Sequence, residues 1–255
     1  MRKKTEGLII SILCAFLIIS CCGSENTFAQ KKELPIYCVD TNEKKIALTI
    51  DVNWADDEHL DEILNILKEK DIKATFFIIG SWVNYAPENA EKLKRINESG
   101  HEIGNHSYSH PDYTKISSDK MISEIKKTNE IIKNTTGVMP KYFRFPSGAY
   151  NNAAVNNIKV NGYIPIQWDV DSLDWKSTSA EAEYDRVTKK VKSGSIILYH
   201  NNGKFTTKSM SRVIDTLKND NYKFVTIDEL LIKENYYVDF VNLHPEDVDE
   251  ILRIR

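Results

Sequence analysis

The sequence predicts an α/β fold in which helices cover a parallel sheet, and three observations carry this prediction. Short runs rich in β-branched and aromatic residues recur along the chain. Amphipathic helical segments lie between them. Several of these segments stop at a glycine, namely at Gly100, Gly137 and Gly194. Alternating strands and helices imply parallel pairing through right-handed crossovers, and the pattern leaves an open doubly wound sheet and a barrel as alternatives.

Seven segments are expected to be strands, and their continuous apolar character is typical of a sheet covered on both faces. They are residues 45–52, 74–80, 102–109, 142–148, 164–171, 195–201 and 223–228. In both architectures reactive groups gather where strands end, at the carboxyl edge of the sheet. That edge is therefore where a site is expected.

Helical periodicity is clearest after the first strand, where four apolar residues recur at helical spacing and form one face. They are Leu60, Ile63, Leu64 and Leu67. Weaker periodicity of the same kind runs through 88–98, 118–134, 180–192 and 207–219. These segments are expected to supply the crossover helices.

Composition indicates a folded chain with no strong preference for a charged partner. Of its 255 residues, 41% are hydrophobic and 10% aromatic, which is enough for a substantial core. The 34 basic residues nearly balance the 37 acidic ones, so no global field favours nucleic acid. Nucleic acid is not expected as a partner.

The first 29 residues resemble an export leader, because the basic MRKK precedes the apolar GLIISILCAFLIIS. IISC before Cys21 fits a lipoprotein signal, which we favour, whereas TFA ending at Ala29 fits ordinary cleavage. An uncleaved anchor is a third alternative, although about 14 apolar residues fall short of the roughly 20 that span a membrane. We expect an extracytoplasmic protein, either lipid-anchored or secreted, that meets the membrane only through this segment.

The rest of the chain divides into three parts: residues 30–43 as a polar connector, 44–233 as the domain and 234–255 as a tail of unassigned role. Only Cys38 would remain after cleavage at Ala29. An intrachain disulfide and a cysteine metal cluster are then both excluded for the cleaved chain.

Polar residues follow five of the predicted strands, in a pattern too regular to be dismissed as chance. They are Asp51, His106, His110, Arg144, Asp171, Asp174 and His200. The spacing of His106 and His110 would bring both imidazoles to one point on a helical turn, which suits zinc or a similar divalent metal. Such a site needs one more protein ligand. Ser107 replaces the glutamate of the HExxH signature, which disfavours a zinc peptidase of that type.

These residues resemble the motifs of a known family. ALTIDV, HSYSH, RFPSG, DVDSLDW and LYH stand in the order and approximate spacing of the five motifs of polysaccharide deacetylases, the NodB-homology group of carbohydrate esterases. The resemblance covers about residues 44–230. It implies a distorted (β/α) barrel with about seven parallel strands, a choice that periodicity left open.

The resemblance also implies a role for each matching residue. Asp51 would be the general base, held ionised by Arg144. His106 and His110 would bind the divalent metal, expected to be zinc. His200 would be the general acid that protonates the leaving amine, kept cationic by Asp174.

Three further residues would contact the substrate. The backbone N–H of Ser147 would stabilise the oxyanion, although the family usually has tyrosine there. Trp175 and Leu198 would line the apolar slot for the acetyl methyl group. Taken singly, these two residues are better explained as ordinary core.

The first motif departs from the family, because Val52 stands where a second aspartate normally binds the metal. Either the site has lost its metal, or another carboxylate replaces the missing one. Asp56 is the first candidate and Asp57 the second, and DVNWAD matches the D-x-x-W-x-D form of a sporulation-type subgroup similar to PdaB and YlxY. Both acids also precede a predicted helix, which they could instead cap.

The sequence as a whole predicts an exported, metal-dependent polysaccharide N-deacetylase acting on an acetylated amino-sugar glycan, with peptidoglycan as the expected substrate. Two alternatives stay open. One is an O-acetyl esterase on the same fold. The other is a noncatalytic protein that binds cell-wall glycans.

Overall fold

The computed structural model describes residues 32–231, which belong, apart from Lys32, to one compact unit that starts at Glu33. The predicted leader (1–29) and tail (234–255) lie outside the described residues. Among residues 32–231, no helix is both long and apolar enough to cross a membrane.

All ladders of the sheet are parallel, and β1 lies at its centre. The strand order is β5-β4-β3-β2-β1-β7-β6, with β8 paired to β1. The strands are β1 (Lys45–Val52), β2 (Thr75–Ile78), β3 (Glu102–Asn105), β4 (Tyr142–Phe143), β5 (Ile164–Pro165), β6 (Val170–Asp171), β7 (Ile196–His200) and β8 (Lys223–Val225). The bounds predicted for the first strand are thereby confirmed.

The run 164–171, predicted as one strand, forms two strands at opposite ends of the sheet, β5 and β6. From Pro165 to Val170 the chain spans at most about 18 Å. Six inter-strand gaps of a flat sheet would cover about 29 Å. The sheet must therefore curl until its edges approach each other, and this curling produces the distorted barrel.

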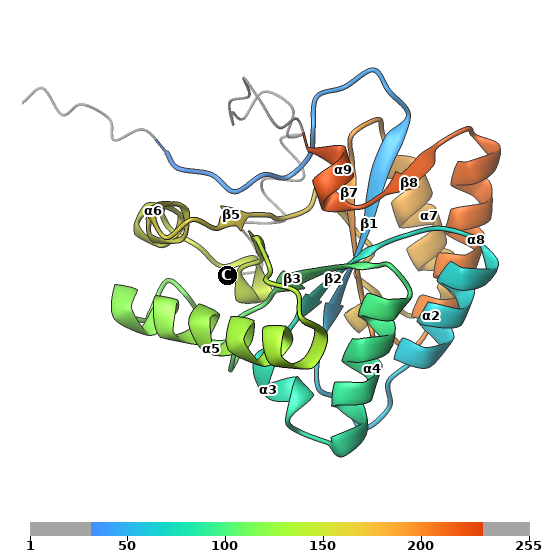
Figure 1. The fold of residues 1–255 in the computed structure, drawn as a ribbon. Coiled ribbons are helices and arrows are strands. Elements are labelled where there is room, and N and C mark those ends of the chain that lie inside the picture. Colours follow the sequence, from blue (N-terminus) through green and yellow to red (C-terminus); the bar gives the residue numbers. More distant parts are fainter. Residues whose placement is uncertain (1–31, 232–255) are drawn as a thin grey trace, which may run out of the picture. The chain divides into compact units, whose positions relative to one another are not determined.

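Helices surround the sheet in Figure 1. They are α2 (Leu60–Glu69), α3 (Gly80–Val83), α4 (Pro87–Glu98), α5 (Ser118–Thr136), α6 (Asn152–Val160), α7 (Ala180–Lys190), α8 (Thr206–Asn219) and α9 (Ile227–Leu230). The predicted apolar face of α2 is buried as expected. Gly137 ends α5 with a φ of 79°, a conformation open to glycine at little cost. The sequence did not predict α3, α6 and α9, because they are short or carry little helical periodicity.

Residues 30–43, predicted as a polar connector, differ from that prediction, because the described part of this segment packs onto the sheet. Leu34, Ile36 and Val39 are buried, and Ile36 forms a parallel bridge with Ile166. The amide of Gln167 donates to the Ile36 carbonyl at 2.7 Å. Burial of these apolar side chains is favourable, because it removes apolar surface from water. The segment therefore packs over the chain between β5 and β6.

Gly104 permits a close approach that positions the future site. It lies opposite Phe77 in the β2–β3 ladder, and a Cβ atom at Gly104 would lie 2.5 Å from the Phe77 ring. The Arg144 guanidinium lies 4.0 Å from the centroid of the same ring. A side chain at residue 104 would therefore displace the surface on which Arg144 rests.

We expect Gly104→Ala to lower the free energy of unfolding by about 1–3 kcal/mol, the usual cost of overpacking a core. Urea denaturation of the two proteins measures the difference. The exposed Ser123→Ala on α5 serves as a control and should stay within about 0.5 kcal/mol of the parent. Equal stability of the Gly104→Ala variant and the parent would contradict the packing argument.

Candidate active site

The centre of the candidate site is a buried ion pair between β1 and the end of β4. Arg144 Nη1 lies 2.8 Å from Asp51 Oδ1, and both side chains are almost entirely buried. Burial by itself would raise the pKa of Asp51, but the charge of Arg144, together with the neighbouring imidazoles of His106 and His200, outweighs it and lowers the pKa. Asp51 is therefore a carboxylate near neutral pH, as a general base must be.

The Arg144 side chain is fixed on several sides. Nη1 also donates to Thr49 Oγ1 at 2.9 Å, and Nη2 donates to the Gln167 carbonyl at 3.1 Å. The guanidinium rests on the Phe77 ring, with the Trp168 ring centroid 5.4 Å away. A planar cation held between hydrogen bonds and rings has little freedom to turn away from Asp51.

The two candidate metal ligands lie in a loop rather than on the helical turn that the spacing suggested. Ser107 and His110 have φ values of 65° and 54°, which interrupt any helix. The fold still brings the rings of His106 and His110 together, with centroids 4.9 Å apart. Two left-handed residues and the end of β3 thus produce the convergence that we had expected from a helix.

His106 is oriented by its own hydrogen bond. Its Nδ1 donates to the Arg144 carbonyl at 2.9 Å, which leaves Nε2 directed at Asp51 Oδ2, 3.3 Å away. Burial lowers the pKa of His106, and burial together with His106 lowers the pKa of His110 to about 4. Both rings are neutral near pH 7, the form in which imidazole binds metals.

A second pair, His200 and Asp174, lies at the end of β7. His200 Nδ1 is 2.7 Å from Asp174 Oδ1, while Asp174 Oδ2 accepts from the His200 amide at 2.6 Å and from Thr206 Oγ1 at 2.8 Å. Burial opposes the charge on the imidazole, but Asp174 outweighs it and raises the pKa of His200 to about 9. His200 therefore carries a proton that it can donate at neutral pH.

Val52 leaves an apolar position beside these groups. It is fully buried in β1, next to Asp51, and pairs with Ile78 of β2. Asp56 and Asp57 lie exposed on a bend before α2. Neither caps α2: the N-cap residue is His59, whose side chain makes no capping bond, and the Leu60 amide is bound by Glu58 Oε2 at 3.0 Å.

The segment that carries Asp56 is held at both ends by Asn201. The Asn201 side chain accepts from the Asn53 amide at 2.8 Å and donates to the Asn53 carbonyl at 3.1 Å, while its backbone carbonyl accepts from the His59 amide at 2.8 Å. Only the middle of the loop is free of these bonds. As a metal ligand, Asp56 would have to reach the histidines by rearrangement of that middle part.

The donor set fits a divalent metal in part. His106 and His110 supply two neutral imidazoles, and Asp51 supplies the neighbouring carboxylate, which is the chemistry that zinc prefers. As the side chains stand, no group of three His, Cys, Asp or Glu residues within 32–231 is close enough to hold a metal ion. The two histidines fit the metal, and Asp56 as third ligand stays a prediction.

The three residues predicted to contact substrate differ in exposure. Ser147 is exposed, with a φ of 53°, in the short 3-10 turn Pro146–Gly148. Trp175 is 55% exposed and so is not core, whereas Leu198 is buried in the sheet as core. Their contacts with substrate stay predictions.

Sequence reasoning missed two residues that support the catalytic pairs, Thr49 and Thr206. A signal for Thr49 existed, because residues two apart on a strand share a face and Thr49 precedes Asp51 by two. Thr206 gave no such signal, since it begins α8 and meets Asp174 only in the folded chain.

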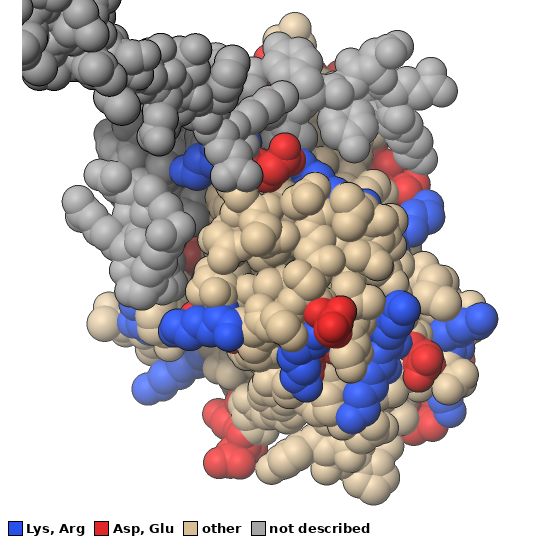
Figure 2. All heavy atoms as spheres, turned by 90° about the vertical axis from the view of Figure 1, so that its left-hand side faces the viewer, with Lys and Arg blue, Asp and Glu red and all other residues tan. Residues whose placement is uncertain are grey.

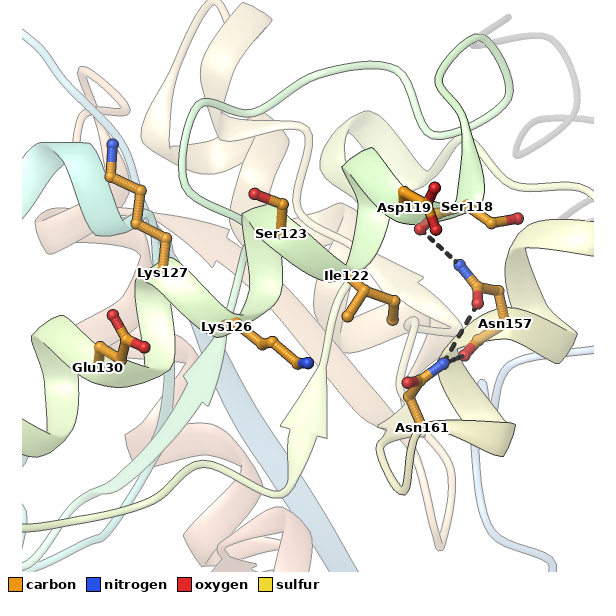
Figure 3. A pocket seen from close by; sticks show the side chains of 9 residues that line it. All are labelled: Ser118, Asp119, Ile122, Ser123, Lys126, Lys127, Glu130, Asn157 and Asn161. Atoms are coloured by element: carbon orange, nitrogen blue, oxygen red, sulfur yellow. Dashed lines mark hydrogen bonds between the residues drawn. The ribbon is translucent and has the colours of Figure 1, made fainter.

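A hollow of about 570 Å³ between α5 and α6 is lined by none of the predicted site residues. Figure 3 shows its lining side chains, among them Lys126 and Glu130 of α5 and Asn157 of α6. On the face shown in Figure 2, basic and acidic side chains are interspersed, so this face has no broad area of one sign.

Comparison with known proteins gives consistent results. The sequence model of the polysaccharide deacetylase family matches residues 39–166. YlxY of Bacillus subtilis, an uncharacterized protein, is 36% identical to this chain. The aligned part covers 77% of this chain and 60% of the length of YlxY. The peptidoglycan-N-acetylmuramic acid deacetylase PdaA of Bacillus subtilis is 32% identical, with 78% of this chain and 75% of PdaA covered.

Solved structures confirm the predicted fold. The structure of PdaA, a family 4 carbohydrate esterase, superposes with a TM-score of 0.73 at 30% identity, covering 79% of this chain and 86% of PdaA. BA3943 of Bacillus anthracis, a CE4 family pseudoenzyme, superposes with a TM-score of 0.73 at 37% identity, covering 79% of this chain and 70% of BA3943. A BA3943 mutant with restored enzymatic activity matches equally well. Since the family model spans half of the chain and these relatives align along more than three quarters of it, the chain belongs to the polysaccharide deacetylase family.

Proposed function

We propose that this protein hydrolyses N-acetyl groups of an amino-sugar polysaccharide, and that its substrate is peptidoglycan. One observation carries the proposal, namely that a proposed general base and a proposed general acid end the adjacent parallel strands β1 and β7. The base, Asp51, is paired with Arg144, and the acid, His200, is paired with Asp174. Two neutral histidines lie beside the base. PdaA, a relative of similar fold, acts on peptidoglycan according to its name. Membership of the family supports the same reaction here.

The chemistry follows from the two protonation states. Asp51 would take a proton from the attacking water while the water oxygen bonds to the acetyl carbonyl carbon. His200 would give its proton to the amine nitrogen as the C–N bond breaks, which releases acetate and the free amino sugar. Base and acid are already in the required forms at neutral pH, so the cycle can begin without prior proton exchange.

A divalent metal, with zinc the first candidate, would be held by His106 and His110, and Asp56 would supply the third ligand. When bound, such an ion lowers the pKa of water and polarises a carbonyl. Asp51, whose Oδ2 lies 3.3 Å from His106 Nε2, would face the same point from β1.

The cellular place of the reaction is also part of the proposal. Peptidoglycan lies outside the cytoplasm, and the leader-like residues 1–29 support export, by lipid anchoring at Cys21 or by secretion.

A second function, glycan binding without turnover, is favoured by one observation. Val52 is buried and apolar where the family has a metal-binding aspartate, and Asp56 is exposed. BA3943, at 37% identity, is a pseudoenzyme on the same fold. The experiments below distinguish the two functions.

Incubation of the protein with N-acetylated peptidoglycan is expected to release acetate, and a chelator is expected to abolish this release. Re-added Zn²⁺ should restore it. Acetate would be measured by an enzymatic assay, with O-acetylated glycan as a parallel substrate. Release that persists in chelator would contradict metal dependence, and no release from any glycan would favour the binding function.

Asp56→Ala is expected to weaken Zn²⁺ binding by about tenfold or more, because it removes a charged ligand, whereas Asp57→Ala should leave binding unchanged. Titration calorimetry measures both variants. Val52→Asp tests the alternative that no carboxylate replaces the ligand missing at this position, with the uncharged Val52→Asn as its control. Tighter binding in Val52→Asp together with no effect of Asp56→Ala would show that the third ligand is missing.

The rate of acetate release should fall as pH rises through about 9, because His200 then loses the proton that the amine requires. Asp174→Asn removes the strongest contribution that keeps His200 cationic, so the alkaline limb should move to lower pH. The rate at neutral pH should fall by roughly 10²–10⁴-fold, the usual contribution of general acid–base catalysis. A pH–rate profile of both proteins checks this, and an unmoved alkaline limb would exclude His200 as the acid.

A further inference from the structure

The loop between the two candidate metal ligands is bound by a buried carboxylate of α5, Glu124, which lies outside the five motifs. Glu124 Oε2 accepts from the amides of Tyr108 and Ser109, at 3.1 and 2.7 Å, and from Ser109 Oγ at 3.0 Å. Its other oxygen, Oε1, lies 2.8 Å from Lys120 Nζ. The side chain is only 2% exposed, so one carboxylate oxygen collects three donors away from bulk water.

The carbonyls of the same loop are bound by α3. The Gly80 amide donates to the Ser107 carbonyl at 2.9 Å, and the Ser81 amide donates to the Tyr108 carbonyl at 3.0 Å. The backbone between the histidines is thus held by α3 through its carbonyls and by Glu124 through its amides.

The loop needs such support because its backbone is unusual. Ser107 and His110 both lie in the left-handed region, which L residues rarely adopt unless their surroundings hold them there. The local bonds inside the loop are few: Ser107 Oγ accepts from the His110 amide at 3.0 Å, and Asn105 Oδ1 accepts from the Ser107 amide at 2.8 Å. Neither of them restrains Tyr108 and Ser109.

Glu124 acts from a rigid base. Asn105, at the end of β3, donates to the Ile125 carbonyl at 2.9 Å and to Asn129 Oδ1 at 2.7 Å, which joins α5 to the strand that carries the loop. The helix and the start of the loop therefore form one unit, and Glu124 can hold the loop against it.

We propose that Glu124 is a positioning residue that fixes the spacing of His106 and His110, so that both imidazoles meet at one ion. The identity of that ion rests on the proposed function, whereas the restraint on the loop does not. Burial raises the pKa of Glu124, but Lys120 and the bonds from Ser109 outweigh it and lower the pKa, so the group stays a charged acceptor.

Hydrogen exchange in the full chain tests the restraint without requiring activity. Glu124→Ala should speed exchange of the Tyr108 and Ser109 amides by about tenfold or more, because a lost bond of about 1.4 kcal/mol is tenfold in opening. Glu124→Gln keeps one acceptor oxygen and should give an intermediate rate. Glu130→Ala, an exposed glutamate of the same helix, should change neither amide.

Zn²⁺ titration of the same variants tests the consequence. Residues that orient metal ligands contribute roughly 10–100-fold to metal affinity. The Zn²⁺ affinity of Glu124→Ala should therefore fall by that factor, whereas Glu130→Ala should keep the affinity of the parent. Unchanged exchange in Glu124→Ala, or in Glu124→Gln should the alanine variant fail to fold, would overturn the proposal. A parent protein that binds no Zn²⁺ would contradict the metal-dependent function, and the exchange rates would still decide the role of Glu124.

Discussion

The rest of the site depends on the buried guanidinium of Arg144. A group with an ordinary pKa above 12 keeps its charge, and its complete burial obliges the surrounding chain to supply compensation. Asp51 supplies the opposite charge, and Thr49 and the Gln167 carbonyl supply acceptors. Because the Arg144 carbonyl also fixes the ring of His106, one residue connects the proposed base, a candidate metal ligand and the segment between β5 and β6 that carries Gln167.

Environment alone separates the roles of the two ionised pairs. Asp51 and His200 are adjacent partners in the β1–β7 ladder, yet the pKa of one is lowered and that of the other is raised to about 9. The separation arises because Arg144 lies behind the carboxylate and Asp174 behind the imidazole. Two titratable groups whose pKa values are pushed apart in this way form an acid and a base that coexist at one pH.

Val52 and the loop after it bear most directly on turnover. The base, the acid and both histidines have the partners that their proposed roles need, so the catalytic groups have not been lost together. What differs from the family motif is Val52, which is part of the apolar core at the position where the resemblance implies a metal-binding aspartate. The same fold is shared by PdaA, a family 4 carbohydrate esterase, and BA3943, a pseudoenzyme, so the fold alone does not decide turnover.

The sequence by itself determined the parallel α/β class, the bounds of β1, the main helices and which polar residues end the strands, because continuous apolar runs, helical periodicity and glycine stops are local features of the sequence. It did not determine that residues 164–171 serve both edges of the sheet, that 33–39 pack as core or that the histidine loop is left-handed. These depend on contacts between distant segments. Glu124 looks like any helix glutamate until α5 packs against the loop. The loop that carries Asp56 is held at its ends by Asn201, which lies 148 residues after Asn53 in the sequence. Only the folded chain brings such partners together, since curling of the sheet decides which strand ends face one another.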